Sequence, residues 1–340
     1  MRTIIRIGLC LALVSFLHTI TTAEDKENVA RKLLEKSYQQ ANIWAQRPMQ
    51  FVADVTLPQG KKSALQLTYK VSWAGPSRWR AEWSGSGYSR VVIVNDGKMF
   101  RFSSEPVPPL PVLEFERGLG ALTGHGFSGP VAAIPSLNGV KVEIFERKFG
   151  KSRAECFSVK NTPGQICVDT TSAQALAWNG DGSRFEYSDY VPVGSSNFFP
   201  TTVRQIAGNE TLLDVRVTVT TPADLPDTLF AAPVNATMTE YPTCTRGSGT
   251  LQGSTLEKRV MPGYPQNAKA AHHQGNVLLY AIVGKDGSVE MLKPIVATWP
   301  ELQTAAMNAV KDWKYSPYLV CDQPVEMEML ISVNYSLSTF

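Results

Sequence analysis

Period-two alternation of apolar residues runs through most of the chain between Phe51 and Thr220. Turn-forming residues, among them Asn95-Asp96-Gly97, divide it into short segments. As a strand, each such segment has one apolar and one polar face, and tight turns place successive strands antiparallel. We therefore predict about ten antiparallel strands that share one large concave apolar face.

One helical pattern precedes these strands. Apolar residues between Ala30 and Ala45 recur three or four positions apart, Glu24 and Asp25 suit a helix start, and Pro48 ends the pattern. A large apolar sheet face has to close into a barrel or be covered by a helix. We predict an α+β fold, in which a mostly antiparallel β half-barrel carries a packed helix and a small α/β module follows.

The alternation stops in the middle of this block. Prolines recur from Pro106 to Pro111, and the glycine-rich stretch Gly118 to Gly129 shows no strand pattern. Long segments without periodicity are usually functional loops or lids. We predict a long loop or lid at this place.

The first residues have the features of a secretory signal peptide. Arg2 and Arg6 precede the apolar run Ile7 to Leu17, and polar and small residues follow up to Ala23. A membrane-spanning helix needs about 20 apolar residues, so this run is short. We predict cleavage after Ala23 and a periplasmic location. The alternative is an uncleaved N-terminus that anchors the chain in the inner membrane.

The composition is that of a folded globular protein. Hydrophobic residues make up 43% of the chain and charged residues 19%, which excludes a mostly disordered protein. Without Arg2 and Arg6, 31 of the 33 basic residues remain against 30 acidic ones, a net charge of +1. No cluster of Lys and Arg marks a nucleic-acid surface, so we expect no nucleic-acid partner.

The length of 340 residues suits two domains. A segment rich in Thr, Gly and Ser, with almost no apolar pattern, separates them. We predict a signal peptide at residues 1–23, an antiparallel β domain at 24–235, a linker at 236–255 and a C-terminal domain at 256–340.

Of the five cysteines, Cys10 lies in the predicted signal peptide and four remain. An even number in an exported chain favours disulfide bonds. Cys156 and Cys167 flank a turn between two alternating segments, so we expect them to pair across a hairpin. Cys244 and Cys321 are then left to pair by elimination.

The C-terminal part has a more specific pattern. We predict, in order, a short helix at Gln266 to Ala271, a hairpin at Asn276 to Val296 that turns at Gly284 to Gly287, a helix from Pro300 to Trp313 and a last strand from Val325 to Leu337.

This order of elements resembles the TonB C-terminal domain family over Lys258 to Leu337. The residues that carry the resemblance are Tyr264-Pro265-x-x-Ala268, Gly275-x-Val277, Asp286-Gly287-x-Val289, Ala305-Ala306 to Trp313-Lys314-Tyr315-x-Pro317, and Pro324-Val325. Two loops depart from the family pattern, at Thr298-Trp299 and at Cys321-Asp322-Gln323.

The resemblance implies that this module binds an envelope protein, for example an outer-membrane transporter, which adds an extended segment to a sheet edge. The implied edge is the last strand, with the Tyr264-Pro265 segment nearby. The implied partner-binding residues are Tyr264, Pro265, Val325, Glu326, Met327, Glu328, Met329, Leu330 and Ile331. The alternative is that this edge is blocked or pairs in a homodimer.

The preceding block resembles the LolA-like lipoprotein-carrier superfamily in its opening helix, in the hairpin Val91 to Phe102 and in its ending from Phe199-Pro200 to Leu229-Phe230. This resemblance implies a second hypothesis, a lipid or lipoprotein carrier that holds an acyl ligand. The candidate lining residues are the aromatic residues Trp73, Trp79, Trp83, Phe100 and Phe102. The alternative is that these rings are ordinary core, because every strand needs one buried face.

No residue pattern indicates catalysis. His125, His272 and His273 lack the spacing of metal ligands or of a catalytic triad, and the chain has no phosphate-binding glycine motif and no HExxH. We expect no metal site, no cofactor and no enzymatic activity.

Overall fold

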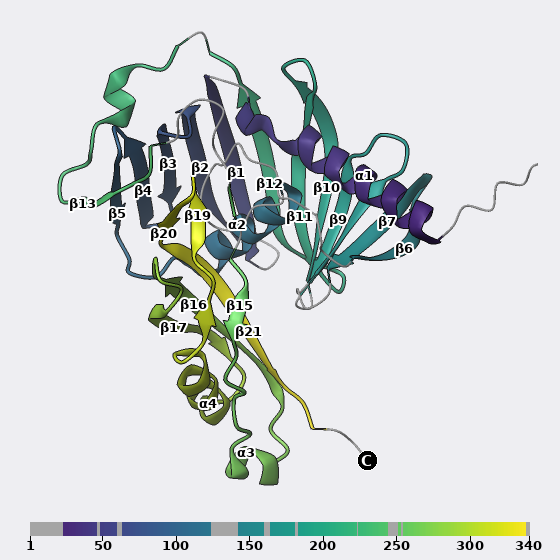
Figure 1. The fold of residues 1–340 in the computed structure, drawn as a ribbon, viewed down its shortest axis with the longest axis vertical. Helices are drawn as coiled ribbons and strands as arrows, with labels where there is room; N and C mark the ends of the chain where they lie inside the picture. The colour runs from purple at the N-terminus through teal and green to yellow at the C-terminus, as the bar shows by residue number, and fades with distance from the viewer. Residues whose placement is uncertain are drawn as a thin grey trace, which may run out of the picture.

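The computed structural model describes residues 23–45, 48–59, 63–123, 142–159, 164–180, 183–222, 224–243, 251–252 and 254–337. They form a large curved antiparallel sheet that carries helices, followed by a smaller C-terminal α/β module (Figure 1). This confirms the predicted α+β class. Apart from Ala23, the predicted signal peptide lies outside the described residues. None of the helices that the described residues form is long and apolar enough to cross a membrane.

The strands of the large sheet are β1 (Met49–Gln59), β2 (Ser63–Gly75), β3 (Arg78–Gly85), β4 (Tyr88–Asn95), β5 (Lys98–Ser103), β6 (Val142–Phe149), β7 (Ser152–Val159), β8 (Gln165–Asp169), β9 (Ala175–Gly180), β10 (Ser183–Val193), β11 (Asn197–Ala207), β12 (Glu210–Thr220) and β13 (Thr237–Glu240). Among the described residues they pair in the order β13-β5-β4-β3-β2-β1-β12-β11-β10-β9-β8-β7-β6. Neighbouring strands in this order pair antiparallel, and the β1–β12 pair joins the two halves of the sheet.

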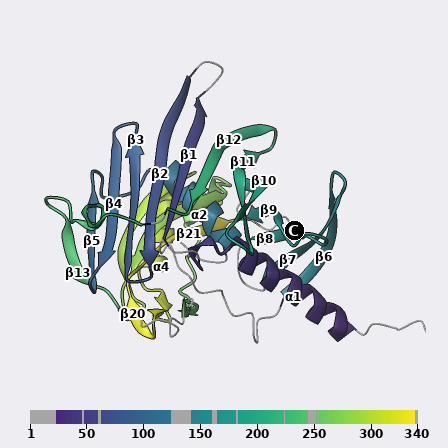
Figure 2. The ribbon, with the colours of Figure 1, turned by 90° about the horizontal axis from the view of Figure 1, so that it is seen from above.

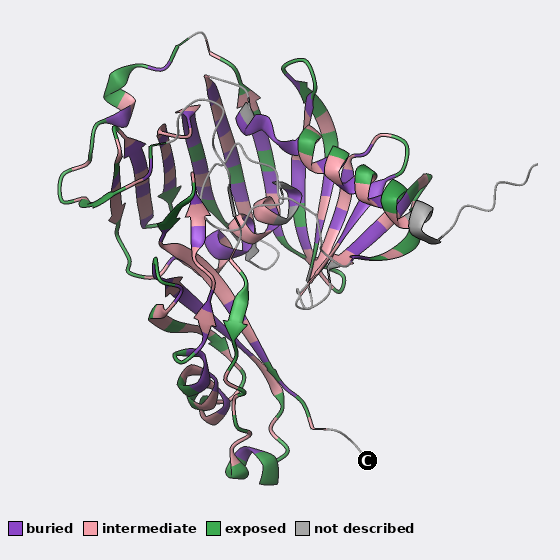
Figure 3. Cartoon of the chain, in the orientation of Figure 1, coloured by how far each residue is buried: buried purple, intermediate pink, exposed green. Residues whose placement is uncertain are grey.

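Two helices cover the concave face of this sheet, α1 (Ala23–Ala41) and α2 (Leu110–Thr123). Figure 2 shows the strands curving around α2. Buried and exposed residues alternate along the strands, as the period-two pattern predicts (Figure 3). Phe115 of α2 packs edge-on against Tyr69 and Trp83, with ring centroids 5.7 and 5.3 Å apart. The core therefore lies between the helices and the concave face.

The end of α1 is fixed by a side chain of the sheet. The last carbonyl groups of a helix have no partner within the helix. Asn197 of β11 donates from Nδ2 to the carbonyl oxygens of Gln39, Gln40 and Asn42 at 2.9, 3.2 and 3.0 Å. A short 3-10 helix, η1 (Ile43–Ala45), then leads towards β1. The predicted helix is thus present, and it ends earlier than Pro48.

The prediction of a loop from Gly118 onward is wrong for its first part, because α2 extends to Thr123. Pro111 lies in the first turn of α2, where a missing N–H costs no hydrogen bond. Gly118 is required for close packing, since a Cβ atom there would lie 2.6 Å from the ring of Phe185. Residues 124–141, which contain the rest of the predicted loop or lid, lie outside the described residues.

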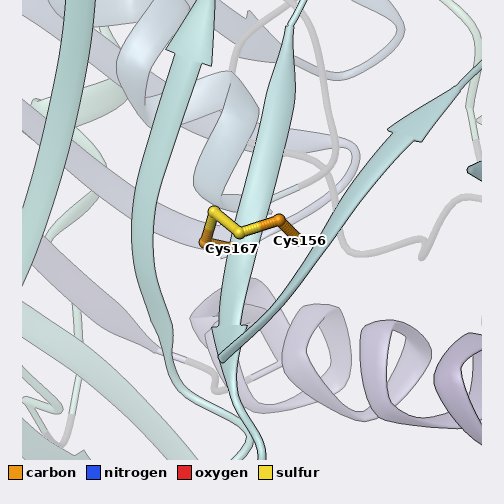
Figure 4. The surroundings of a disulfide bond; sticks show 2 residues. All are labelled: Cys156 and Cys167. Carbon is orange, nitrogen blue, oxygen red and sulfur yellow. A yellow bond between two sulfur atoms is a disulfide. The ribbon is translucent and has the colours of Figure 1, made fainter. Parts of the chain in front are cut away.

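The Cys156–Cys167 disulfide is present and confirms the predicted hairpin pairing (Figure 4). The two residues lie opposite each other in β7 and β8, with Cα atoms 3.9 Å apart, and both are fully buried. Loop entropy alone gives such a short closure about 3 kcal/mol. Cys321 also takes part in a disulfide bond. Its predicted partner, Cys244, lies outside the described residues, so that pairing stays a prediction.

The C-terminal module consists of β15 (Leu256–Lys258), α3 (Gln266–Ala270), β16 (Gly275–Val283), β17 (Val289–Ala297), α4 (Pro300–Val310), β18 (Lys314–Tyr315), β19 (Tyr318–Val320), β20 (Gln323–Val325) and β21 (Met327–Tyr335). Its main sheet has the order β17-β16-β21, and α4 packs on one face of it. The short strands β15, β18, β19 and β20 were not predicted from the sequence.

The segment predicted as a linker is partly strand. Thr237–Glu240 form β13, which pairs with β5 at the edge of the large sheet. β14 (Leu251–Gln252) pairs with β19 of the C-terminal module. Residues 244–250 between them lie outside the described residues. The predicted domain boundaries stay a prediction.

Candidate functional site

β21 is an edge strand of the C-terminal sheet. It pairs with β16 in unbroken antiparallel register, from Met327 opposite Val283 to Tyr335 opposite Gly275. No other strand in the described part of the chain pairs with β21 on its far side. An edge of this kind presents backbone N–H and C=O groups that can pair with a second chain.

The opposite edge of the sheet, β17, is protected against such pairing. It contains Pro294, which has no N–H to donate, and its register with β16 shifts at two places. Prolines and β-bulges are devices by which edge strands avoid pairing with other chains. β21 contains neither a proline nor a register shift. Of the two edges, β21 is therefore the one suited to accept a strand.

One hydrogen bond at the end of the sheet indicates which backbone groups of β21 face outward. Gly284, next to β16, donates its N–H to the carbonyl oxygen of Ser288 on the β17 side at 2.8 Å. Because successive residues of a strand direct these groups to opposite sides, the odd-numbered residues of β16 face β21. Their partners in β21 are also odd-numbered. The backbone groups of Leu330, Ser332 and Asn334 therefore face away from β16.

The side chains of β21 hold this edge in place. Ile331, Val333 and Tyr335 are buried in the core that β16, β21 and α4 share. On the other face, the Ser332 hydroxyl donates to Oδ1 of Asn276 at 2.9 Å, and Asn334 is exposed. A strand packed in this way presents a rigid edge.

Tyr264 lies beside the end of β21. Its ring packs edge-on against Tyr335, with centroids 5.5 Å apart, and its hydroxyl donates to the carbonyl oxygen of His273 at 2.5 Å. Pro265 occupies the N-cap position of α3. Both residues thus support the module itself, and their implied role in partner binding stays a prediction.

Val325 does not open the last strand, as the sequence predicted, but belongs to β20. It pairs with Tyr318 of β19 and is buried in a small apolar cluster with Tyr318 and Val320. Tyr241, which follows β13 of the large sheet, packs against this cluster and against the core of the large sheet. Val325 therefore lies at the junction of the two parts of the chain.

Glu326 and Glu328 form ion pairs with the large sheet. Arg101 of β5 donates to Glu326 at 2.6 Å, and Arg90 of β4 donates to Glu328 at 2.5 Å. The Arg90 and Glu328 side chains are only 15% and 16% exposed. The hydroxyl of Tyr280 in β16 also donates to Glu328, at 2.8 Å. The start of β21 and the residue before it are thus engaged within the chain.

A third carboxyl, Glu116 of α2, lies near this junction. It accepts a hydrogen bond from the indole Nε1 of Trp83 at 2.9 Å. Burial raises the pKa of Glu116 to about 7, and the charge of Glu328 adds to this rise, whereas the charge of Arg90 opposes it. For Glu328, burial also opposes ionisation, but the pairing with Arg90 outweighs it and lowers the pKa. Glu328 is therefore ionised when Glu116 still holds its proton.

Four residues on the large-sheet side of this junction were not predicted from the sequence: Arg90, Arg101, Glu116 and Tyr241. Arg90 and Arg101 lie 238 and 225 residues from their partners in the chain. One local signal was present, because each arginine lies in an alternating strand two positions from a residue of the concave-side core, Tyr88 for Arg90 and Met99 for Arg101. A charge at such a position needs a partner.

The aromatic residues considered for a lipid site fall on two faces of the large sheet. Trp73, Trp79 and Trp83 are buried in the core on the concave side. Phe100 instead packs with Leu225 and Phe230 in a separate cluster. These four rings therefore pack in hydrophobic clusters of the fold. The lipid-carrier hypothesis stays a prediction.

Comparison with solved structures gives similarities for the large sheet. A LolA superfamily protein from Nitrosomonas europaea is 12% identical, with a TM-score of 0.40, over 59% of this chain and 97% of that one. A domain assigned to outer membrane lipoprotein sorting from Vibrio parahaemolyticus is 8% identical, with a TM-score of 0.38, over 60% and 96%. A DUF1329 family protein from Desulfovibrio piger is 8% identical, with a TM-score of 0.40, over 59% and 97%.

No curated protein sequence matches the chain. Residues 260–337 match the family described as the Gram-negative bacterial TonB protein C-terminal. This range includes α3, α4, β16, β17 and β21 and ends two residues after β21. The C-terminal module, with its open β21 edge, is thus similar to the Gram-negative bacterial TonB protein C-terminal.

Proposed function

We propose that the chain is a non-enzymatic component of the bacterial envelope, whose C-terminal module binds an extended segment of another envelope protein by strand addition to β21. One observation carries this proposal: the backbone groups of Leu330, Ser332 and Asn334 face outward on an edge without proline or bulge. In strand addition, main-chain hydrogen bonds supply the affinity. The match to the TonB protein C-terminal supports an envelope partner.

The proposed location is the periplasm, reached through the signal peptide predicted at residues 1–23. The proposed partner class is an outer-membrane transporter with an extended segment on its periplasmic side. The accessible length, Leu330 to Asn334, allows the outward backbone groups of three residues to pair with such a segment.

A proline at Ser332 tests the proposal in cells. A photo-crosslinking residue at the exposed Asn334 records what lies beside the edge. Because Ser332 directs its N–H outward, Ser332→Pro removes a donor to the partner while the bonds to β16 remain. Loss of one or two backbone hydrogen bonds, at about 1 kcal/mol each, should reduce the affinity for the partner, and with it the crosslink, about five- to thirtyfold.

The matched control is Ser332→Ala, which removes the hydroxyl that contacts Asn276 but keeps the backbone N–H. This variant should crosslink like the unchanged chain. Mass spectrometry of the product should identify one envelope protein, joined through a short extended segment. Equal crosslinking by both variants, or a product that joins two copies of this chain, would contradict the proposal.

A further inference from the structure

In the part of the chain that the structure describes, the two parts meet at a junction that we call the latch. It consists of the ion pairs Arg90–Glu328 and Arg101–Glu326 and of the contact of Tyr241 with the cluster around Val325. Figure 1 shows β19, β20 and the start of β21 beside the large sheet and α2. The latch thus engages the first residues of the strand whose later residues form the open edge.

We propose that the latch is a pH-dependent switch, in which Arg90 changes its partner from Glu328 to Glu116 and so releases the start of β21. The consequence for partner binding rests on the proposed function. The switch itself does not.

Arg90 is shared between two carboxyl groups. Its Nη2 donates to Glu328, whereas its Nη1 is buried and makes no hydrogen bond with the described residues. Glu116 lies on the Arg90 side of the junction, since Trp83, which donates to Glu116 at 2.9 Å, stands directly opposite Arg90 in the β3–β4 pair. The charges of Glu328 and Arg90 accordingly act on Glu116. A single guanidinium cannot fully compensate two partly buried carboxylates. While Glu116 is protonated, the pair with Glu328 is electrically balanced.

The other groups around Glu116 do not change charge near neutral pH. Trp83 of β3 donates to its carboxyl and does not titrate. The hydroxyls of Tyr69 of β2, Tyr88 of β4 and Tyr280 of β16 also interact electrostatically with Glu116, and burial raises the pKa of each above its ordinary value. Glu116 is therefore the group at this junction that titrates near pH 7.

We call the C-terminal module docked when the latch holds it against the large sheet. Docking is linked to proton binding by Glu116, and this linkage decides how docking depends on pH. The pKa of Glu116 in the docked state is about 7, above its ordinary value of 4.5. Undocking admits water to Glu116 and moves the charge of Glu328 away from it, so the pKa of Glu116 falls towards 4.5. The docked state then binds the proton more tightly, and docking is strongest at low pH. It weakens as the pH rises through the window up to about 7, where Glu116 ionises, repels Glu328 and attracts Arg90.

For partner binding, release would extend the open edge. The docked chain offers the backbone groups of Leu330, Ser332 and Asn334, and release would add Glu328 at the start of β21. Partner strands would accordingly bind more tightly at pH 8 than at pH 5.

The switch is tested without any partner, by the distance between two labels. In the full chain, the exposed residues Thr218 of β12 and Asn308 of α4 are each replaced by a non-natural residue that carries a nitroxide label. Double electron–electron resonance then gives the distance distribution at pH 5 and pH 8. We expect one distance at pH 5 and a second, released population at pH 8, with the docking constant at least tenfold lower.

Three variants test whether Glu116 causes the pH dependence of the label distance. Glu116→Gln keeps an acceptor for Trp83 but cannot ionise, so it should show the docked distance at both pH values. Glu328→Gln removes the charge that acts on Glu116 and weakens the ion pair with Arg90, so its released population should be present at both pH values. Glu82→Gln, in an ion pair with Arg80 of the same strand, should behave like the unchanged chain.

The same pH response in Glu116→Gln and in the unchanged chain would overturn the switch. So would a single unchanged distance in the unchanged chain at both pH values. Neither result affects crosslinking through Asn334, and a failure of the Ser332→Pro test would not alter the label distances. The two proposals can therefore fail separately.

Discussion

Replacing Arg90 by Met is expected to release the C-terminal module from the large sheet at every pH. The substitution leaves the Glu328 carboxylate at a nearly buried position without its cation. Removing one partner of a buried ion pair costs about 3–5 kcal/mol, because the remaining charge has to be dehydrated without compensation. Release restores water to Glu328. The label distance between β12 and α4 should show mainly the released population.

The double variant Arg90→Met with Glu328→Leu separates electrostatics from packing. Replacing both members of a buried ion pair by apolar side chains of similar volume is often neutral or stabilising. The double variant should therefore dock again and should have lost its pH dependence. Arg184→Met, which removes a half-exposed ion pair with Glu186, is the control and should leave docking unchanged. A docked Arg90→Met single variant would contradict the assigned role of Arg90.

Gly287→Ala is expected to disrupt the β16–β17 hairpin. Gly287 has a φ of +83°, and a Cβ atom there would overlap the backbone carbonyl of Tyr315. This contact is part of the fold, since Tyr315 donates its N–H to the Gly287 carbonyl at 2.9 Å. The left-handed conformation alone costs about 1–2 kcal/mol for a residue with a Cβ atom, and the overlap adds to this. We expect a total loss of about 3 kcal/mol or more.

Hydrogen exchange followed by mass spectrometry measures this effect on residues 275–297. Their amide protection should fall strongly in Gly287→Ala. Gly263→Ala provides the control, because a Cβ atom at Gly263 meets nothing within 4 Å. Unchanged protection in Gly287→Ala would show that the hairpin tolerates a side chain at this turn.

Most of the fold follows from local sequence patterns. The alternation from Phe51 onward and the spacing of apolar residues in the α1 and α4 segments each report one buried face. The helix α2 was missed because Pro111 and Gly118 are usually turn signals. In this fold the proline lies in the first helical turn, and the glycine allows the helix to approach Phe185.

The candidate site could be predicted only in part. The strictly alternating sequence after Val325 correctly indicated a strand with one buried face. The strand's division into an engaged start and an open end depends on Arg90 and Arg101, which lie in distant strands. No local pattern encodes such a pairing. The very short strands β18 to β20 were missed because two or three residues are too few to show a period.

Strand addition to β21 is tested most directly by the amide hydrogen exchange of individual residues in β21, measured by NMR spectroscopy. In the free chain, Leu330, Ser332 and Asn334 should exchange quickly, whereas Met329, Ile331 and Val333 should be protected by β16. The probe is a synthetic peptide of the segment that crosslinks to Asn334. Added in excess, it should protect the three even-numbered amides and leave the odd-numbered ones unchanged. Fast exchange at Leu330, Ser332 and Asn334 with the peptide bound would contradict strand addition to this edge.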